Sequence, residues 1–183
     1  MSDFEQTLKI PKERVAILIG TKGETKKALE KDTNSKINVD SEGAVTITSK
    51  DSISSWIAKQ IVKAIGRGFS PEIARLLLND NYVFELIELK DFASNEKGMK
   101  RLKGRVIGER GKAQKTIEEL TDGYIAIFGK TIGLIAEVSK METLRTAIEM
   151  LLSGARHATV FAKLEKQRRN WKRDELLGNI NNI

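Results

Sequence analysis

The sequence predicts an α+β protein built from two copies of one small unit, each a three-stranded sheet backed by three helices, followed by a C-terminal helix. Three observations favour this class. Residues 19–23 (Ile-Gly-Thr-Lys-Gly) recur as residues 107–111 (Ile-Gly-Glu-Arg-Gly), so that both glycines repeat at an offset of 88 residues. The same order of strand and helix patterns, β-α-α-β-β-α, surrounds both segments. The chain of 183 residues is long enough for two such units.

The first repeat opens with a strand, because residues 4–10 alternate between apolar and polar side chains. Pro11 then favours a helix that ends at Gly20, since proline is common at the first helical position. A second helix is expected over residues 24–32. The sheet is completed by two short strands, at residues 37–39 and 45–47, with a turn between them at residues 41–43.

A long amphipathic helix ends the first repeat, and Asp51 or Ser52 is suited to cap it. Its apolar side chains recur at helical spacing and are expected to face the core: Ile53, Trp56, Ile57, Ile61 and Ile65. Residues 66–68 (Gly-Arg-Gly) have the composition of a linker. Residues 71–78 then predict a short connecting helix.

The second repeat follows the same plan. We expect a strand over residues 82–89 and a polar loop over residues 90–96. Two helices follow, at residues 98–107 and 112–120, and then two strands, at residues 124–128 and 131–138. A long helix begins near residue 141, and its inward face is expected to carry Leu144, Ile148, Leu151 and Leu152. Gly154 is a possible interruption, and residues 159–177 again have a helical pattern.

This order divides the chain into four expected segments. Residues 1–68 form the first module and residues 69–80 a connecting helix. Residues 81–158 form the second module, and residues 159–183 a basic C-terminal helix and tail. Each module is small enough to be only marginally stable by itself.

Composition narrows the class of protein. The net charge of +7 and the pI of about 9.5 favour an anionic partner, most commonly nucleic acid. The absence of cysteine excludes disulfides, thiolate metal sites and cysteine nucleophiles. A single histidine, His157, excludes a multi-histidine metal site and lacks the context of a catalytic base. Residues 129–131 (Gly-Lys-Thr) lack the spacing of a phosphate-binding loop. We therefore expect no cofactor and no enzymatic activity.

No stretch of the sequence approaches the roughly 20 apolar residues of a membrane span. The first five residues, Met-Ser-Asp-Phe-Glu, are not typical of a signal peptide. We therefore expect a cytoplasmic protein.

A Gly-x-x-Gly turn between two helices suits contact with a sugar-phosphate chain. Glycine permits the sharp turn and lets another backbone approach closely. The helix that follows offers free N–H groups and a partial positive charge to a phosphate. In the first copy, the expected contacts are Gly20, Thr21, Lys22, Gly23, Lys26 and Lys27. In the second copy, they are Arg101, Lys103, Arg105, Gly108, Glu109, Arg110, Gly111, Lys112 and Lys115.

Neighbouring segments extend this picture. The bases of a bound strand would need an apolar surface beneath them, the floor of the groove. The residues expected to form this floor could equally be ordinary core: Ile19, Ile37, Val39, Ile107, Ile125 and Ile127. The basic tail at residues 163–173 could contact RNA, a partner protein or only solvent. Within it, Trp171 could stack on a base or pack on the protein.

Residues 106–121 combine Val-Ile-Gly-x-x-Gly with a following Ile-Glu-Glu-Leu-Thr and a strand. This pattern resembles the KH family, and the resemblance covers nearly the whole chain as two tandem type I KH modules, βααββα. It implies a groove that clamps about four nucleotides of single-stranded RNA or DNA at the turn. Glu109 departs from this pattern, because it places an acid where the turn would meet a phosphate.

Four segments sharpen the resemblance: residues 103–108, 146–148, 154–157 and 164–169. They look like those of the archaeal relatives of the eukaryotic KH-domain assembly factors for the small ribosomal subunit. This resemblance implies binding near the 3′ end of small-subunit rRNA, in ribosome assembly or translation. It also implies two protein partners, the endonuclease that trims that rRNA end and the α subunit of translation initiation factor 2.

Two alternatives stay open. One is an RNA-binding subunit of an RNA-degrading complex, although such chains usually carry a β-barrel module whose run of short strands is not seen here. The other is a protein-interaction scaffold whose KH folds bind no RNA.

Overall fold

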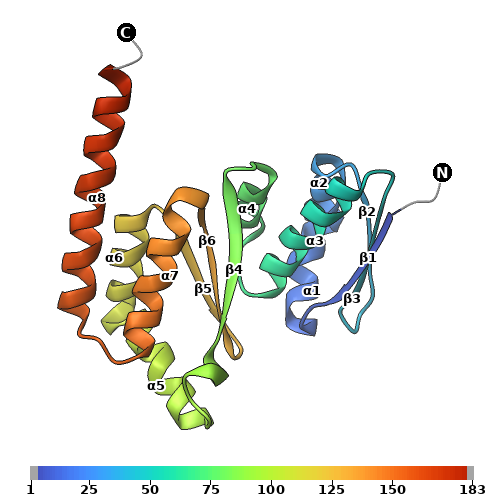
Figure 1. Ribbon diagram of the computed structural model, residues 1–183. Coiled ribbons are helices and arrows are strands. Elements are labelled where there is room, and N and C mark those ends of the chain that lie inside the picture. The colour runs from blue at the N-terminus through green and yellow to red at the C-terminus, as the bar shows by residue number, and fades with distance from the viewer. Residues whose placement is uncertain (1–3, 181–183) are drawn as a thin grey trace. The chain divides into compact units, whose positions relative to one another are not determined.

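The structure is a computed structural model that describes the backbone of residues 4–180 and the side chains of residues 4–177 (Figure 1). It contains two three-stranded sheets with helices, so the predicted α+β class is confirmed. Contacts divide the chain into two compact units, which are described separately. The first unit contains residues 1–87 and 126–135, and the second contains residues 88–125 and 136–183.

The first repeat folds in the predicted order of elements. These are β1 (Phe4–Lys9), α1 (Lys12–Ile19), α2 (Glu24–Asp32), β2 (Lys36–Val39), β3 (Ala44–Ser49) and α3 (Ser52–Gly66). The central strand β3 pairs antiparallel with both β1 and β2. Val45 and Ile47 are buried while Thr46 and Thr48 are only half-buried, because successive side chains of a strand point to opposite faces.

The core of the first repeat lies between this sheet and its helices. Leu18 of α1, Leu29 of α2 and Ile61 of α3 are each at most 1% exposed. Ile37 and Ile47 of the sheet are fully buried as well. Burying a side chain of this size stabilises the fold by about 1.5–3 kcal/mol, so this cluster holds the helices on the sheet.

Two residues predicted to be core are on the surface. Ile53 is 66% exposed and Trp56 is 56% exposed, so the prediction that they face inward is wrong. The buried face of α3 begins instead with Ser55 and Ala58. Trp56 lies about 100° around the helix from Ser55, because an α-helix has 3.6 residues per turn. Small side chains thus face the sheet in the first turns, and the large ones face solvent.

The predicted linker at residues 66–68 begins too early. Gly66 is the last residue of α3 and is buried, and a Cβ there would lie 2.6 Å from Cγ2 of Ile10. The predicted connecting helix is present as α4 (Pro71–Ala74) followed by a 3₁₀ turn (Arg75–Leu78). Ser70 caps α4 by accepting a hydrogen bond from the N–H of Ile73.

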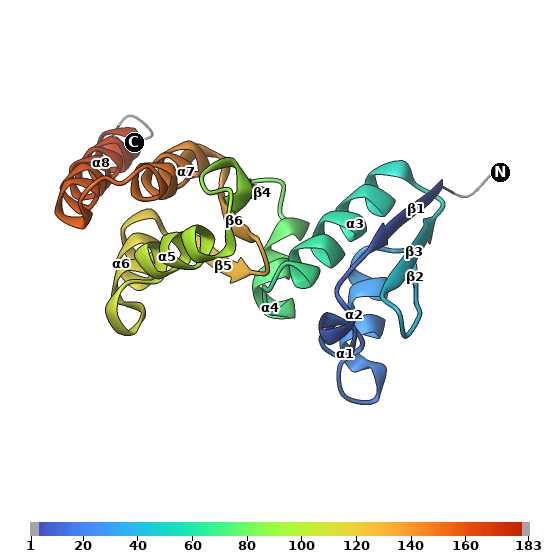
Figure 2. The ribbon, with the colours of Figure 1, turned by 90° about the horizontal axis from the view of Figure 1, so that it is seen from below.

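The second repeat has the same order of elements, shown from another side in Figure 2. They are β4 (Tyr82–Glu88), α5 (Glu96–Ile107), α6 (Lys112–Thr121), β5 (Tyr124–Phe128), β6 (Thr131–Glu137) and α7 (Val138–Leu152), followed by α8 (His157–Ile180). The strand order is β4-β6-β5, so the last strand is again central. The predicted inward face of α7 is buried.

Three helices begin earlier than the sequence pattern suggested. Asn95 caps α5 by accepting the N–H of Gly98 at 2.7 Å, so the helix begins at Glu96. The α7 helix begins at Val138, directly after β6, and α8 begins at His157. In each case polar or exposed first-turn residues concealed the start, because periodicity detects only the apolar face.

The central strand β6 is buried along residues 131–136, which agrees with the absence of polar side chains after Thr131 in this stretch. In the first unit, Phe69 and Phe84 pack edge to face, with ring centroids 6.0 Å apart. A Cβ at Gly133 would lie 2.8 Å from Cε2 of Phe69. Glycine at this position therefore makes room for the Phe69 ring, which is only 2% exposed.

Replacing Gly133 with alanine is expected to destabilise the protein by about 1–3 kcal/mol, because the new methyl group overpacks a closed site. Gly104→Ala is the matched control, since a Cβ there meets nothing within 4 Å and alanine favours the helix. The control should raise stability by about 0.5–1 kcal/mol. Urea unfolding midpoints measure both effects, and equal shifts for the two variants would contradict the packing argument.

Candidate nucleic-acid interface

The two Gly-x-x-Gly turns share one backbone conformation. In each turn both glycines and the second middle residue are left-handed, with positive φ. The φ angles agree between copies: 73° and 74° at Gly20 and Gly108, 53° and 52° at Lys22 and Arg110, and 78° and 77° at Gly23 and Gly111. The sequence repeat is therefore also a repeat of local geometry.

The two glycines of each turn serve different purposes. A Cβ at Gly20 would lie 2.1 Å from Oγ1 of Thr25, and one at Gly108 would lie 2.5 Å from Cβ of Ala113. The first glycine is thus required by packing against the next helix. The second glycine, Gly23 or Gly111, has nothing within 4 Å of the same position. Its bare face is open, and the backbone of a ligand can approach it there.

Lys22 and Arg110 are strained as well as exposed. A left-handed conformation costs an ordinary L-residue about 1–2 kcal/mol. Glycine or asparagine would relieve that cost, yet both copies place a long cation at this point. Strained residues concentrate at functional sites, so this outlier directs attention to the two side chains.

Helices α2 and α6 begin at the turns without a side-chain cap. Gly23 and Gly111 occupy the N-cap positions, and no side chain accepts a hydrogen bond from the N–H groups of the first turn. In contrast, Asp51 and Asn95 cap α3 and α5. The first-turn N–H groups of α2 and α6 and the positive ends of their dipoles are therefore available to a phosphate.

Exposed lysines follow one turn into each helix. Lys27 of α2 and Lys115 of α6 occupy equivalent positions and are both exposed. The ammonium of Lys115 lies 3.8 Å from a carboxylate oxygen of Glu119, an exposed pair that contributes little to stability. Both lysines add positive charge beside the open end of their helix.

The copies differ in where they place an acid. The first middle residue of the turn is Thr21 in one copy and Glu109 in the other. The first residue of the following helix is Glu24 in one copy and Lys112 in the other. All four side chains are exposed, so each contributes its charge or hydroxyl to the surface of its own turn.

The second helix of the first repeat is fixed to the edge of the sheet by two side chains. Glu30 accepts the N–H of Ile37 at 2.8 Å. Lys26 donates to the carbonyl of the same residue at 2.9 Å and lies 3.4 Å from Glu30. The ammonium of Lys26 is thus already engaged within the fold.

The second repeat contains the same arrangement. Glu118 accepts the N–H of Ile125 at 2.8 Å, and Gln114 donates to its carbonyl at 2.9 Å. Sequence reasoning missed this role of the two glutamates. Their common offset of 88 residues, the same as that of the glycines, was the signal that could have revealed it.

The edge of β2 continues toward the turn. Because the N–H and carbonyl of Ile37 bond to α2, they point away from β3. The backbone groups of an antiparallel edge strand alternate in direction, so those of Val39 point the same way. The N–H of Ile37 meets Glu30 and its carbonyl meets Lys26, so β2 runs antiparallel to α2. Val39 therefore lies closer than Ile37 to the Gly-x-x-Gly turn at the start of α2. Val39 therefore presents a backbone donor and acceptor in the space between α2 and the strand.

Arg14 and Arg105 fasten the ends of the third helices. Arg14 donates to the carbonyls of Ile65 and Phe69 at 2.7 and 2.6 Å. Its burial lowers the pKa of its guanidinium, with an opposing effect of Glu13. In the second repeat, Arg105 donates to two carbonyls at the end of α7, those of Leu151 and Ala155.

Arg105 is therefore not free for the RNA contact expected from the sequence. His157 adds to the same network, since its Nε2 lies 2.7 Å from the carbonyl of Arg105. Its ring also lies 6.0 Å from that of Phe161. These contacts give His157 a structural role at the start of α8.

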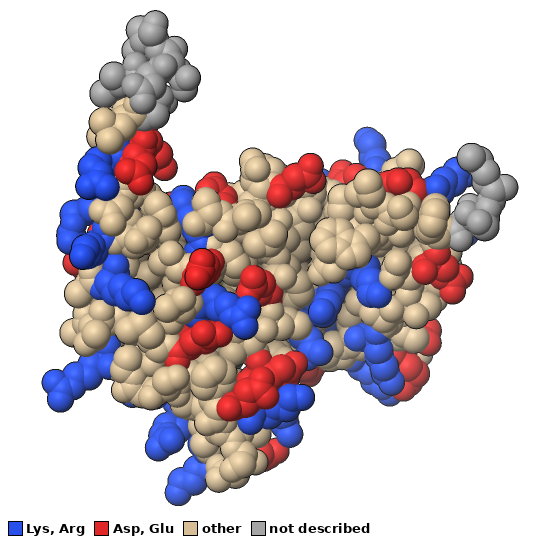
Figure 3. All heavy atoms as spheres, in the orientation of Figure 1, with Lys and Arg blue, Asp and Glu red and all other residues tan. Residues whose placement is uncertain are grey.

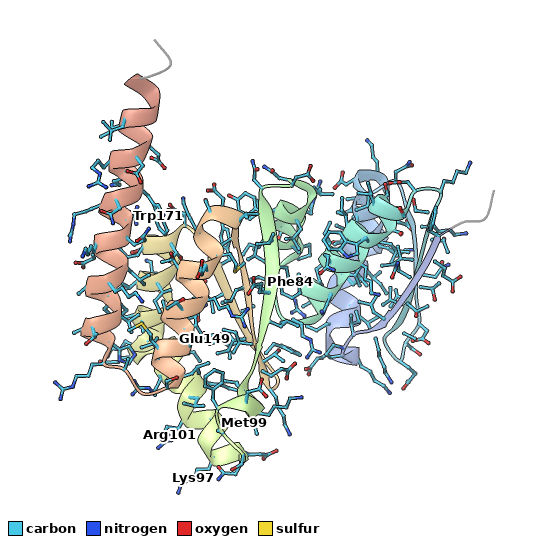
Figure 4. All side chains as sticks on the ribbon, in the orientation of Figure 1. Phe84, Lys97, Met99, Arg101, Glu149 and Trp171 are labelled. Atoms are coloured by element: carbon cyan, nitrogen blue, oxygen red, sulfur yellow. The ribbon has the colours of Figure 1, made fainter. Side chains whose placement is uncertain are left out.

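The other basic residues of α5 lie farther from the turn. Lys97 at the beginning of α5 and Arg101 in its middle are exposed, and Figure 4 shows both side chains directed away from the body of the unit. Arg101 lies seven residues before Gly108, about 10 Å along a helix. Lys103 is half-buried. These cations border the turn instead of lining it.

The expected apolar floor separates into two kinds of residue. Ile37 is fully buried and Ile125 is 5% exposed, so both belong to the core. Ile107 is 37% exposed, and the side chains of Ile19 and Val39 are half-buried. The accessible apolar surface therefore lies at the turn and along the strand edge.

Other kinds of site are not seen in the part of the chain that the structure describes. Residues 4–177 contain no group of three or more acidic, histidine or cysteine side chains that could hold a metal ion. Among the described helices, none is long and apolar enough to cross a membrane.

Comparisons with protein-family models match both repeats. Residues 5–64 match the KH domain, and residues 83–169 match the eukaryotic-type KH domain, KH-domain type I. The chain is 45% identical over 172 residues to a KH domain-containing protein of Methanocaldococcus jannaschii, covering 92% of this chain and 76% of that protein. It is 32% identical over 111 residues to the RNA-binding protein Pno1 of Dictyostelium discoideum, covering 58% of this chain and 46% of that protein.

A solved structure is also similar. Dim2p of Pyrococcus horikoshii, crystallised in a complex with a/eIF2α and rRNA, has a TM-score of 0.85 and 43% sequence identity, covering 92% of this chain and 96% of that chain. Two matched repeats, a close relative over most of its length and this structural agreement point to one conclusion. The chain belongs to the KH family, as a Pno1/Dim2-type protein with two KH domains in tandem.

Proposed function

We propose that this protein binds single-stranded RNA through its two Gly-x-x-Gly turns, near the 3′ end of small-subunit rRNA, in ribosome assembly or translation. One observation carries the proposal: both turns hold an exposed cation in a left-handed conformation beside an uncapped helix start. The rRNA present in the complex of the Pyrococcus horikoshii relative supports this class of ligand.

The geometry suggests how a strand would lie. A phosphate would sit at the bare face of the second glycine, where it would receive N–H groups of the following helix. Lys22 or Arg110 would contact the same phosphate or its neighbour. In the first repeat, a base would then reach the strand edge, where the N–H and carbonyl of Val39 can read its hydrogen-bonding groups.

The proposed contact set is reduced by two of the residues expected from the sequence. Lys26 and Arg105 are engaged within the fold, as described above. The residues that stay in the set are Gly20, Thr21, Lys22, Gly23, Lys27, Gly108, Glu109, Arg110, Gly111, Lys112 and Lys115, with Arg101 and Lys103 as outer contacts.

We expect the second turn to be the main rRNA site and the first to support it or to face a partner. The second turn has Lys112 at the first position of its helix, where the first has Glu24. It also has cations along the preceding α5. Glu109 opposes this advantage and would adjust the strength of the phosphate contact.

The wider assignments follow from the same proposal. Residues 1–68 and 81–158 would be the two RNA-binding modules, connected by residues 69–80 and followed by a basic helix and tail at residues 159–183. The α subunit of initiation factor 2 and an rRNA-trimming endonuclease are the proposed protein partners, in the cytoplasm. The KH family is of an RNA-binding, non-catalytic kind, and we propose that this chain binds rRNA without modifying it.

A protein-interaction role is favoured by one further observation. Phe4, Ile53 and Trp56 of the first unit are between 48% and 66% exposed. Lys59 of α3 donates to Gln6 of β1 at 2.8 Å, which brings this face of α3 next to β1. An apolar surface of this kind suits a protein partner, so a scaffold role is the second candidate.

Replacing Lys22 and Arg110 with aspartate, singly and together, is expected to lower affinity for single-stranded RNA. Aspartate tolerates a left-handed backbone, so the fold should survive. Each change reverses one charge at a phosphate, and we expect a loss of about tenfold or more per dominant site at moderate salt. Binding is measured by fluorescence anisotropy with a labelled RNA.

Lys22→Gly and Arg110→Gly are the control variants for this experiment. They remove the cation and relieve the left-handed strain, so stability should stay equal or rise while RNA affinity falls. If the folded aspartate variants bound RNA as well as the unchanged protein, the groove model would be wrong and the scaffold role would be favoured.

Glu109→Thr is expected to strengthen RNA binding about two- to fivefold, because it removes an acid from the phosphate site. Threonine occupies the equivalent position in the first turn, so the backbone accepts it. The reciprocal Thr21→Glu variant should weaken binding by a similar factor. Titrations at several salt concentrations test the pair, and a Glu109→Thr variant that binds less tightly would show that the carboxylate itself contacts the RNA.

Crosslinking of bound RNA in cells, followed by sequencing, tests the proposed ligand. Reads should concentrate at the 3′ end of small-subunit rRNA. Reads spread over messenger RNA, with none at that end, would instead favour a subunit of an RNA-degrading complex.

A further inference from the structure

We infer that the outer face of α8 is an additional RNA-binding surface, which holds the strand beyond the nucleotides gripped by the second turn. The inference rests on the proposed function, because it extends the path of the same RNA. It concerns a helix that lies after the βααββα elements of the second repeat.

The cations of α8 form an ordered strip. Lys163, Lys166 and Arg169 are exposed and lie three residues apart, so they follow one another along one side of the helix. Lys163 is at the edge nearest α7, where its ammonium lies 3.9 Å from the sulfur of Met150 in a weak, exposed contact. The strip covers about 9 Å at 1.5 Å per residue. Glu165 is exposed four residues before Arg169, so its carboxylate borders the strip at that end and offsets part of the charge there. Figure 3 shows Lys and Arg side chains spaced along this helix.

The opposite face of α8 is fixed to the second unit. Val160 is fully buried and Leu164 is 1% exposed. Arg168 donates to the carbonyl of Glu119 at the end of α6. The ring of Trp171, labelled in Figure 4, lies 5.7 Å from the ammonium of Lys140. These contacts set the rotation of the helix, so the strip always faces outward.

The strip lies beside the elements that carry the second turn. The α8 helix starts where His157 meets the carbonyl of Arg105, three residues before Gly108. It then packs along α6, which carries exposed Lys112 and Lys115 next to the turn. A strand leaving the turn over α6 would therefore meet the cations of α8.

The chemistry of the strip matches a phosphate chain better than an apolar protein surface. Two exposed residues that border it, Thr159 and Ala162, offer no large apolar group. Affinity for nucleic-acid backbones comes mainly from such cations through the release of counterions, and it needs no shaped pocket. A contact with an acidic protein is the competing outcome of the test.

The test compares two RNAs and two triple variants of the full chain. One RNA has about four nucleotides, the length that one KH groove holds, and the other is about three times as long. The strip variant carries K163Q, K166Q and R169Q. The control variant carries the same charge change at exposed lysines elsewhere, K9Q, K50Q and K90Q. Circular dichroism and urea midpoints verify that both variants fold.

The strip variant should bind the short RNA like the unchanged protein but lose about tenfold or more in affinity for the long RNA. The slope of log K against log salt for the long RNA should fall in magnitude by about 2, for three lost contacts with single-stranded phosphates. The control should change both affinities equally and only slightly.

Unchanged affinity of the strip variant for the long RNA would overturn the inference and leave an acidic protein as the better partner. An equal loss for both RNAs would also overturn it, since the strip would then act only through net charge. Failure of the proposed function is seen separately, as unchanged binding of the short RNA by Arg110→Asp.

Discussion

Each repeat depends on a steric constraint at a four-residue turn. Two helices meet there through three residues with positive φ, and the first glycine has no space for a Cβ against Thr25 or Ala113. This geometry aims the start of the next helix outward with its N–H groups uncapped. The same turn places an exposed cation, Lys22 or Arg110, beside those N–H groups. Packing and the capacity to hold an anion therefore come from one local conformation.

The rest of each repeat keeps that turn in position through side chains that bond to backbone. Glu30 and Glu118 hold the second helix to the strand edge, while Arg14 and Arg105 hold the end of the third helix. Basic residues are thus divided between two tasks. Those with carbonyl partners stabilise the framework, because a buried charge must be paired. Those that stay exposed near the turn are available to a ligand.

Local signals predicted most of this fold, because turns, strand alternation and helix periodicity are encoded by neighbouring residues. The α2 helix and both glycine turns were located correctly from such signals. Long-range partners were not predictable in the same way. Arg105 reaches carbonyls 46 and 50 residues away, and Lys26 reaches Ile37 across a turn. The apolar periodicity of α3 wrongly placed Trp56 in the core. Periodicity predicts an apolar face, but it does not show that small side chains such as Ser55 and Ala58 form the buried face in the first turns.

The positions of the tryptophans have an optical consequence. The chain has two, the exposed Trp56 on α3 in the first unit and the half-buried Trp171 on α8 in the second. Indole emission shifts with solvent exposure and is quenched by nearby ligands. Each unit therefore carries a natural fluorophore, and replacing one indole at a time would assign a spectral change to either half of the molecule without an attached dye.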